Sequence, residues 1–237
     1  MNTKRIIPDL FTCGNLLSGS IAVLMATQGQ FKLAFLFILL GVFFDFFDGM
    51  TARALNVVNA TGVELDSLAD EITSGLAPSM MLCCYLYPLI GWWSLIALVM
   101  VAFSAIRLAK FNTDERQKTG FIGLATPANA LFWGGITCMP QALMAWHATP
   151  WILLLMSLLS CYLLISEIPF FSLKFHDLSW KNNYRTYIFL IGCVLLILFC
   201  IVEAVRFHET AYACFAGTIC IMWYVVYNLI TLHSRQA

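Results

Sequence analysis

The runs DFFDGMTAR (45–53) and GVELDSLAD (62–70) place four aspartates within apolar stretches of the chain. An aspartate at the centre of a bilayer costs roughly 2.5–3.5 kcal/mol, so four aspartates without partners would cost about 10 kcal/mol. Asp45 and Asp48 are three residues apart and Asp66 and Asp70 are four apart, so each pair shares one face of a helix. If the two helices form a hairpin across 54–63, the pairs face each other and offer up to eight carboxylate oxygens.

The composition excludes a soluble globular protein. Of the 237 residues, 61% are apolar and 11% are charged, and the mean hydropathy is +0.83. An average soluble domain carries about 25% charged residues. With 13 basic and 13 acidic residues the formal net charge is zero, so a basic nucleic-acid-binding surface is not expected.

Apolar stretches predict an all-α, polytopic membrane bundle of about eight helices, which form one domain over residues 1–237. The first helix is expected to stay in the mature protein, because Pro8, Asp9, Asn15 and Ser18 are unlike a cleavable signal. The nine cysteines are interpreted as packing residues within the spans. The predicted spans are 10–28, 31–55, 64–90, 92–111, 126–145, 150–168, 186–206 and 210–231.

The basic residues predict the orientation of this bundle, because Lys and Arg near span ends are retained on the cytoplasmic side. With the N-terminus inside, Lys32 and Arg206 are outside, and the other eleven of the 13 basic residues are inside. Both termini and the longer polar loops 112–125 and 169–185 are therefore expected in the cytoplasm, at the inner membrane of the cell. The inside set is Lys4, Arg5, Arg53, Arg107, Lys110, Arg116, Lys118, Lys174, Lys181, Arg185 and Arg235.

An oxygen-only ligand set suits hard divalent cations, here Mg²⁺ or Mn²⁺, and four aspartates can hold two ions. None of the four histidines lies in the hairpin, which argues against zinc or a di-iron site. Such ions beside a membrane surface typically serve phosphate chemistry. Gly49 and Ala52 would let a nucleotide approach the helix, and Arg53 would pair with a phosphate.

Each feature alone has a simpler interpretation. An isolated aspartate pair can be a structural hydrogen-bonded group or a proton relay. Gly49 and Ala52 can be helix-packing contacts, and Arg53 can be a positive-inside anchor. Their fixed spacing on adjacent helices favours the phosphate site. A cation or proton transporter remains the alternative from another class, but it predicts polar or broken helices near the midplane.

The pattern resembles the signature of the CDP-alcohol phosphatidyltransferase family, D-x2-D-G-x2-A-R-x8-G-x3-D-x3-D. Every fixed position is present, at Asp45, Asp48, Gly49, Ala52, Arg53, Gly62, Asp66 and Asp70. Flanking segments resemble the membrane-embedded phosphatidylserine synthases of this family. They lie at 7–19, 66–78, 107–112, 123–129 and 168–174, so the resemblance covers a catalytic core of about 7–174 and leaves two additional C-terminal membrane helices within 186–231.

The resemblance implies transfer of the phosphatidyl group of CDP-diacylglycerol to the hydroxyl of L-serine, which gives phosphatidylserine and CMP. It implies that Asp45, Asp48 and Asp66 bind the metal ions, while Asp70 completes the metal site or acts as the catalytic base. It also implies a homodimer. The implied nucleotide and diphosphate site consists of Pro8, Thr12, Asn15, Gly49, Ala52, Arg53 and Gly62.

The acceptor follows less directly from the residues. Serine is zwitterionic and needs a cation for its carboxylate and an acceptor for its ammonium group. Arg107 and Lys110 are candidates for the cation, and Asn112 or an acid of the hairpin for the acceptor. Arg107 could equally be an interface anchor. Glycerol 3-phosphate, inositol and inositol phosphate are the alternative acceptor alcohols.

Overall fold

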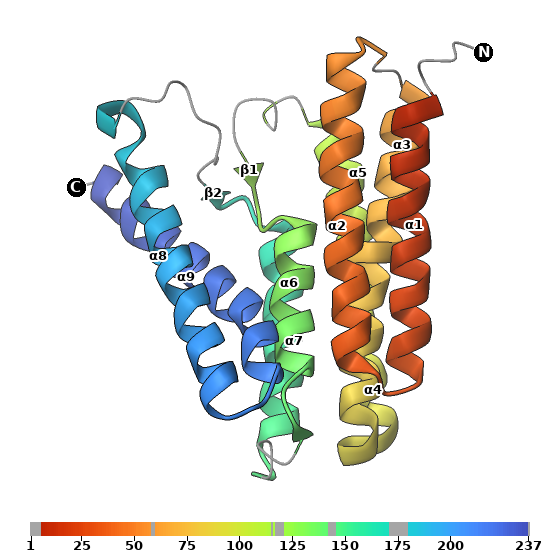
Figure 1. Cartoon of the computed structure of the whole chain (residues 1–237), viewed down its shortest axis with the longest axis vertical. Helices are drawn as coiled ribbons and strands as arrows, with labels where there is room; N and C mark the ends of the chain where they lie inside the picture. Colours follow the sequence, from red (N-terminus) through yellow and green to blue (C-terminus); the bar gives the residue numbers. More distant parts are fainter. Residues whose placement is uncertain are drawn as a thin grey trace.

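The computed structural model describes residues 6–57, 60–114, 116, 121–141, 146–170 and 180–236. It confirms an all-α membrane-type architecture, drawn in Figure 1. Two helical segments are wound differently from the α-helices. The segment η2 (Glu71–Leu76) is a π-helix, and η3 (Gly91–Leu98) is a 3₁₀-helix. The elements in chain order are α1 (Ile6–Thr27), α2 (Phe31–Ala54), α3 (Ala60–Asp70), η2 (Glu71–Leu76), α4 (Ala77–Ile90), η3 (Gly91–Leu98), α5 (Val99–Thr113), β1 (Phe121–Ile122), α6 (Thr126–Thr137), α7 (Thr149–Ile165), β2 (Pro169–Phe170), α8 (Trp180–Arg206) and α9 (Ala211–Gln236).

Five segments of the described chain are long and apolar enough to cross a membrane. One of them, Ala60–Thr113, is helical over 54 residues and contains two legs, because the chain reverses at Gly91, where φ is +57° (Figure 1). With α6 and α7, the described residues form eight helical legs. Since α6 has only 12 residues and a span needs about 20, the number of membrane crossings stays a prediction.

The two ends of the bundle differ in their polar residues. Figure 1 shows both termini at one end, the end at which α2 and α5 finish with Arg53 and Lys110. Exposed tryptophans gather near helix ends at the opposite end, as membrane-interface residues do. They are Trp92, Trp93, Trp146 and Trp151. This arrangement agrees with the predicted even number of helices; which end faces the cytoplasm stays a prediction.

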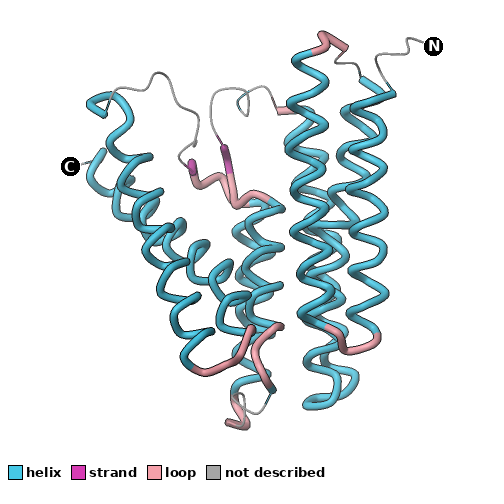
Figure 2. Tube along the Cα trace, in the orientation of Figure 1, coloured by secondary structure: helices cyan, strands magenta, loops and turns pink. Residues whose placement is uncertain are grey.

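Some predicted boundaries differ from the structure. The first helix begins at Ile6 rather than 10, since a proline such as Pro8 is tolerated in the first helical turn. α6 ends at Thr137, well before the predicted 145. The sequence also did not predict the antiparallel pair β1–β2, in which Phe121 lies opposite Phe170 and ties two of the loops together (Figure 2). Several predicted inside residues lie outside the described chain or have undescribed side chains: Lys4, Arg5, Lys118, Lys174, Lys181, Arg185 and Arg235.

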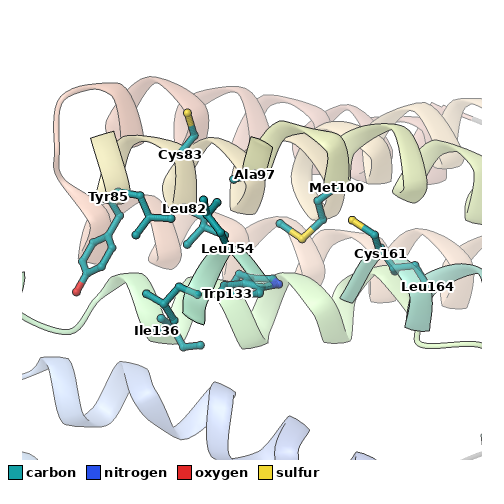
Figure 3. Close-up of a cluster of buried hydrophobic side chains, with 12 residues drawn as sticks. Leu82, Cys83, Tyr85, Ala97, Met100, Trp133, Ile136, Leu154, Cys161 and Leu164 are labelled. Carbon is teal, nitrogen blue, oxygen red and sulfur yellow. The ribbon is translucent and has the colours of Figure 1, made fainter. Parts of the chain in front are cut away.

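The largest buried cluster joins α4, η3, α5, α6 and α7, and Figure 3 shows it around Trp133 and Leu82. Trp133 is fully buried, and its indole Nε1 donates a hydrogen bond to Ser160 Oγ at 3.1 Å. The hydroxyl of Tyr85 donates to the Met139 carbonyl at 3.0 Å. These bonds satisfy the polar atoms of two large aromatic side chains, so burial of the rings is not opposed by unpaired donors.

Close helix packing fixes the part of the bundle that carries the aspartates. Thr73 of η2 is wedged between Gly19 of α1 and Gly41 of α2. A Cβ atom at Gly19 would lie 2.7 Å from the Thr73 Cα, and one at Gly41 would lie 2.5 Å from Thr73 Cγ2. Thr73 Oγ1 also donates a hydrogen bond to the Asn15 carbonyl at 2.9 Å. The glycines therefore set the distance between η2 and the first two helices.

The C-terminal pair α8–α9 packs on the core through α6 (Figure 1). Thr218 Oγ1 of α9 donates to the Phe132 carbonyl of α6 at 2.7 Å. Lys32, at the start of α2, pairs with Glu209 in the turn between α8 and α9. The last two helices thus contact the core at several points, away from the aspartates of α2 and α3.

Candidate active site

Three of the four predicted aspartates meet between α2 and α3, two helices that both pack against α1. One carboxylate oxygen from each of Asp45, Asp48 and Asp66 lies within 4.8 Å of the other two. Asp45 and Asp48 reach the same point because they are one helical turn apart on α2. We call Asp45, Asp48 and Asp66 the aspartate triad.

The first helix supplies hydrogen bonds to this region. Thr12 Oγ1 donates to Asp48 Oδ2 at 2.7 Å, and Asn15 Nδ2 donates to Asp70 Oδ1 at 3.0 Å. Asp70 lies outside the triad but interacts electrostatically with Asp45 and Asp48. The structure therefore separates the predicted ligands into a group of three and a fourth carboxylate that α1 orients.

For the reaction that the family resemblance implies, Asn15→Ala is expected to lower the rate of CMP release roughly 10–100-fold, the usual effect of removing a side chain that orients a ligand or reactive group. The Km for the CDP-activated lipid should change little, because Asn15 does not line the cavity beside the triad. Steady-state kinetics of the purified protein measure both constants. Ser18→Ala is the matched control on α1, since Ser18 Oγ donates only to the Gly14 carbonyl of its own helix. An unchanged turnover number in Asn15→Ala would contradict the orienting role.

A cavity of about 280 Å³ opens beside the triad. Its walls come from the start of α1, the end of α2 and the start of α3, so the hairpin and the first helix close it together. The lining includes six of the seven predicted nucleotide residues: Pro8, Thr12, Gly49, Ala52, Arg53 and Gly62. Two members of the aspartate triad, Asp48 and Asp66, also line the cavity. The seventh predicted residue, Asn15, instead bonds Asp70.

The sequence did not predict three further lining residues, Asp9, Val57 and Val63. Asp9 lies three residues before Thr12, so helical spacing from Thr12 could have indicated it. At Gly49, an added Cβ would meet only the Arg53 guanidinium, at 3.7 Å. The absence of a side chain at Gly49 thus leaves space on the cavity side of α2 next to a positive charge.

The structure does not bring the three residues predicted to bind the acceptor alcohol into one site. Arg107 and Lys110 line a second cavity of about 150 Å³, while Asn112 points to α3 and its Nδ2 donates to Ser67 Oγ at 2.8 Å. The buried Arg107 donates from Nε to the Leu124 carbonyl at 2.6 Å and interacts electrostatically with Asp70. Helix phase explains the separation, because residues three apart share a face and residues five apart do not.

One other cation lines this second cavity, and it is engaged by a neighbour. Arg116 Nη2 lies 2.8 Å from Asp114 Oδ2, and its Nε lies 3.1 Å from both carboxylate oxygens of Asp114. These hydrogen bonds lower the pKa of Asp114 below its usual value, so this carboxylate stays ionised at neutral pH. Arg107 and Lys110 are then the better placed cations for an anionic group in the cavity.

The donor set of the triad fits a hard divalent cation. All three groups offer carboxylate oxygens, which Mg²⁺ and Mn²⁺ prefer. Asp66 Oδ1 is buried and has no hydrogen-bond partner among the described residues, so an oxygen of the triad is left for a further ligand. The described residues bring no histidine or cysteine into the triad, which agrees with the predicted oxygen-only site.

Comparison with known protein families gives a match over nearly the whole chain. The model of the family described as CDP-alcohol phosphatidyltransferase matches residues 5–232. The chain belongs to the CDP-alcohol phosphatidyltransferase family. The match includes the aspartate triad, the cavity and also the two C-terminal helices, in which the sequence alone showed little resemblance.

Individual members of the CDP-alcohol phosphatidyltransferase family are similar to this chain. The CDP-diacylglycerol–serine O-phosphatidyltransferase of Bacillus subtilis is 36% identical over 173 residues, which are 72% of this chain and 92% of that protein. The enzyme of the same name from Helicobacter pylori is 34% identical over 134 residues, 55% of this chain and 56% of that protein. The archaetidylserine synthase of Methanothermobacter thermautotrophicus is 30% identical over 138 residues, 55% of this chain and 59% of that protein. The chain thus spans most of the first relative and little more than half of the other two.

Proposed function

We propose that this CDP-alcohol phosphatidyltransferase transfers the phosphatidyl group of CDP-diacylglycerol to the hydroxyl of L-serine, forming phosphatidylserine and CMP. The observation that carries the proposal is the aspartate triad, two members of which, Asp48 and Asp66, line a cavity that Arg53 also lines. The names of the relatives from Bacillus subtilis and Helicobacter pylori support serine as the acceptor.

In this proposal Asp45, Asp48 and Asp66 hold Mg²⁺ or Mn²⁺, two ions when Asp70 takes part. When bound, such ions neutralise the diphosphate and the charge that develops on the leaving phosphate. Arg53 pairs with the diphosphate, and the small residues Gly49, Ala52 and Gly62 let the cytidine part lie close to the helices. Pro8 and Thr12 of α1 close the other side of the cavity.

The transfer step follows from these placements. The serine oxygen forms a bond to the phosphorus that bears the diacylglycerol. The bond from that phosphorus to the bridging oxygen breaks, and CMP leaves with the bond's electron pair. In this proposal Asp70 accepts the proton of the serine hydroxyl, and its hydrogen bond from Asn15 supports that role. Arg107 binds the serine carboxylate, which its electrostatic interaction with Asp70 and its place beside Lys110 on one cavity support.

An acceptor panel tests the choice of serine. Purified protein in detergent is given CDP-diacylglycerol and Mn²⁺ or Mg²⁺ together with serine, glycerol 3-phosphate, inositol or inositol phosphate. We expect CMP release above background only with serine, and loss of that release when the metal is chelated. Release with another alcohol and none with serine would overturn the acceptor. Ion flux in vesicles without metal-dependent CMP release would favour a transporter instead.

A CDP-activated ether lipid in the same assay tests the lipid part of the substrate, because one relative is named an archaetidylserine synthase.

We infer from the predicted charge bias that the active site faces the cytoplasm. The homodimer stays a prediction of the family resemblance.

A further inference from the structure

A buried polar cluster lies directly after the active-site aspartates, and the proposed reaction leaves it without a role. It contains Glu71 of η2, whose two carboxylate oxygens are both buried and lack hydrogen bonds of standard geometry. The other members are buried to 1% exposure or less and also lack such bonds at their side-chain polar atoms: Ser74, Ser104, Thr126 and Asn129. Ser104 lies on α5, Thr126 and Asn129 lie on α6, and both helices pack against η2.

Gly75 shows that two members of this cluster converge. A Cβ atom built on Gly75 would lie 2.7 Å from Ser104 Oγ and 2.8 Å from Glu71 Oε1. The Glu71 carboxylate and the Ser104 hydroxyl therefore occupy the space that a side chain at position 75 would take. The local π-helix, a conformation often found at functional sites, turns this face of η2 towards α5.

In its ionised form such a carboxylate needs a positive partner, because a buried charge without one costs several kcal/mol. No ion pair of Glu71 occurs among the described residues. The nearest cation along α5, Arg107, is one turn beyond Ser104, and its Nε is already bonded to the Leu124 carbonyl. The hydroxyl and amide oxygens of the cluster add neutral acceptors around the one negative charge. Together they form an environment for a single small cationic group.

We propose that the cluster around Glu71 binds the ammonium group of the amino-acid acceptor, and that Glu71 thereby selects an amino acid over other alcohols. This inference rests on the proposed function. In serine the ammonium and carboxylate groups are both attached to Cα and the hydroxyl to the adjacent Cβ, so their three partners must lie close together. Asp70 precedes Glu71 in the chain, and Arg107 interacts electrostatically with Asp70. The inference therefore assigns the hydroxyl to Asp70, the ammonium to Glu71 and the carboxylate to Arg107.

The test compares Glu71→Gln with the wild-type protein, using serine and 3-hydroxypropionate, which has the same hydroxyl and carboxylate but no ammonium group. In Glu71→Gln we expect the Km for serine to rise about 10–100-fold, the range for a lost hydrogen bond to a charged group. The Km for CDP-diacylglycerol should stay within about twofold of the wild-type value. The preference of the enzyme for serine over 3-hydroxypropionate should fall by the same factor as the serine Km rises.

Two further variants keep the test decisive. Glu203→Gln on α8 is the control and should leave all constants unchanged, because Glu203 is far along the chain from the cluster and pairs with Arg206 on its own helix. Ser104→Ala removes the hydroxyl beside Glu71 and should raise the serine Km several-fold even if Glu71→Gln does not fold.

The outcomes separate this inference from the proposed function. Wild-type protein that does not use serine would overturn both. Wild-type protein that uses serine, with an unchanged serine Km in Glu71→Gln and Ser104→Ala, would overturn the ammonium site alone and make Glu71 a neutral packing residue. A requirement for Na⁺ or K⁺ that disappears in Glu71→Gln at constant serine Km would assign the cluster to an alkali ion and also overturn the inference.

Discussion

Asp66→Asn is expected to reduce CMP release roughly 1,000-fold or more, because it removes one of the three carboxylates proposed to hold the metal ions. Asparagine has nearly the same shape as aspartate, so the packing of α2 and α3 against α1 should survive, but its amide is a neutral and weaker ligand. Asp66 also contributes a buried oxygen, Oδ1, that has no hydrogen-bond partner among the described residues. Turnover of the purified variant at saturating Mn²⁺ measures the effect.

Glu64→Gln is the matched control for this variant. Glu64 lies on the same helix, two residues before Asp66, but its side chain is exposed and does not line the cavity. It should retain wild-type turnover. Substantial activity in Asp66→Asn, in protein that elutes and unfolds like wild type, would show that the triad is not the metal site.

Gly19→Val is expected to give the largest loss of stability, about 1–3 kcal/mol or more in the free energy of unfolding. A Cβ at this position would lie 2.7 Å from the Thr73 Cα, which is backbone and cannot rotate away. The branched side chain must push η2 away from α1. Because Asn15 lies on α1 and its partner Asp70 directly precedes η2, we expect the variant to lose activity as well as stability. Thermal unfolding in detergent, followed by tryptophan fluorescence, measures the change.

Ser20→Ala is the neighbouring control on α1, since Ser20 is exposed and its hydroxyl bonds only to the Leu16 carbonyl of its own helix. Its unfolding free energy should stay within about 0.5 kcal/mol of wild type. A Gly19→Val variant as stable as Ser20→Ala would contradict the close contact between α1 and η2.

Much of the site was predictable because the relevant residues are local in sequence. Helical spacing places Asp45 and Asp48 on one face, and the short connection to Asp66 makes α2 and α3 neighbours. The same locality explains why Gly49, Ala52 and Arg53 line one cavity. Even the contribution of α1 followed from the family resemblance, which included Pro8 and Thr12.

The remaining features depend on tertiary packing, which residue spacing does not determine. Asn15 was expected at the nucleotide but reaches Asp70, because the close packing of α1 on η2 decides what that side chain meets. Asn112 lies on a different face of α5 from Arg107, and only the position of α3 gives it Ser67 as a partner. The π-helical winding of η2, which turns Glu71 towards Ser104, has no recognised sequence signal.

Binding of Mn²⁺ is the most direct measurement of the central claim that the aspartate triad holds a divalent cation. Purified protein, without substrates, is titrated with Mn²⁺, and the loss of the free-ion signal is followed by electron paramagnetic resonance. We predict saturable binding to the wild-type protein, displaced by Mg²⁺, and no such binding to a variant in which Asp45, Asp48 and Asp66 are all changed to asparagine. Equal binding by the two proteins would contradict the claim.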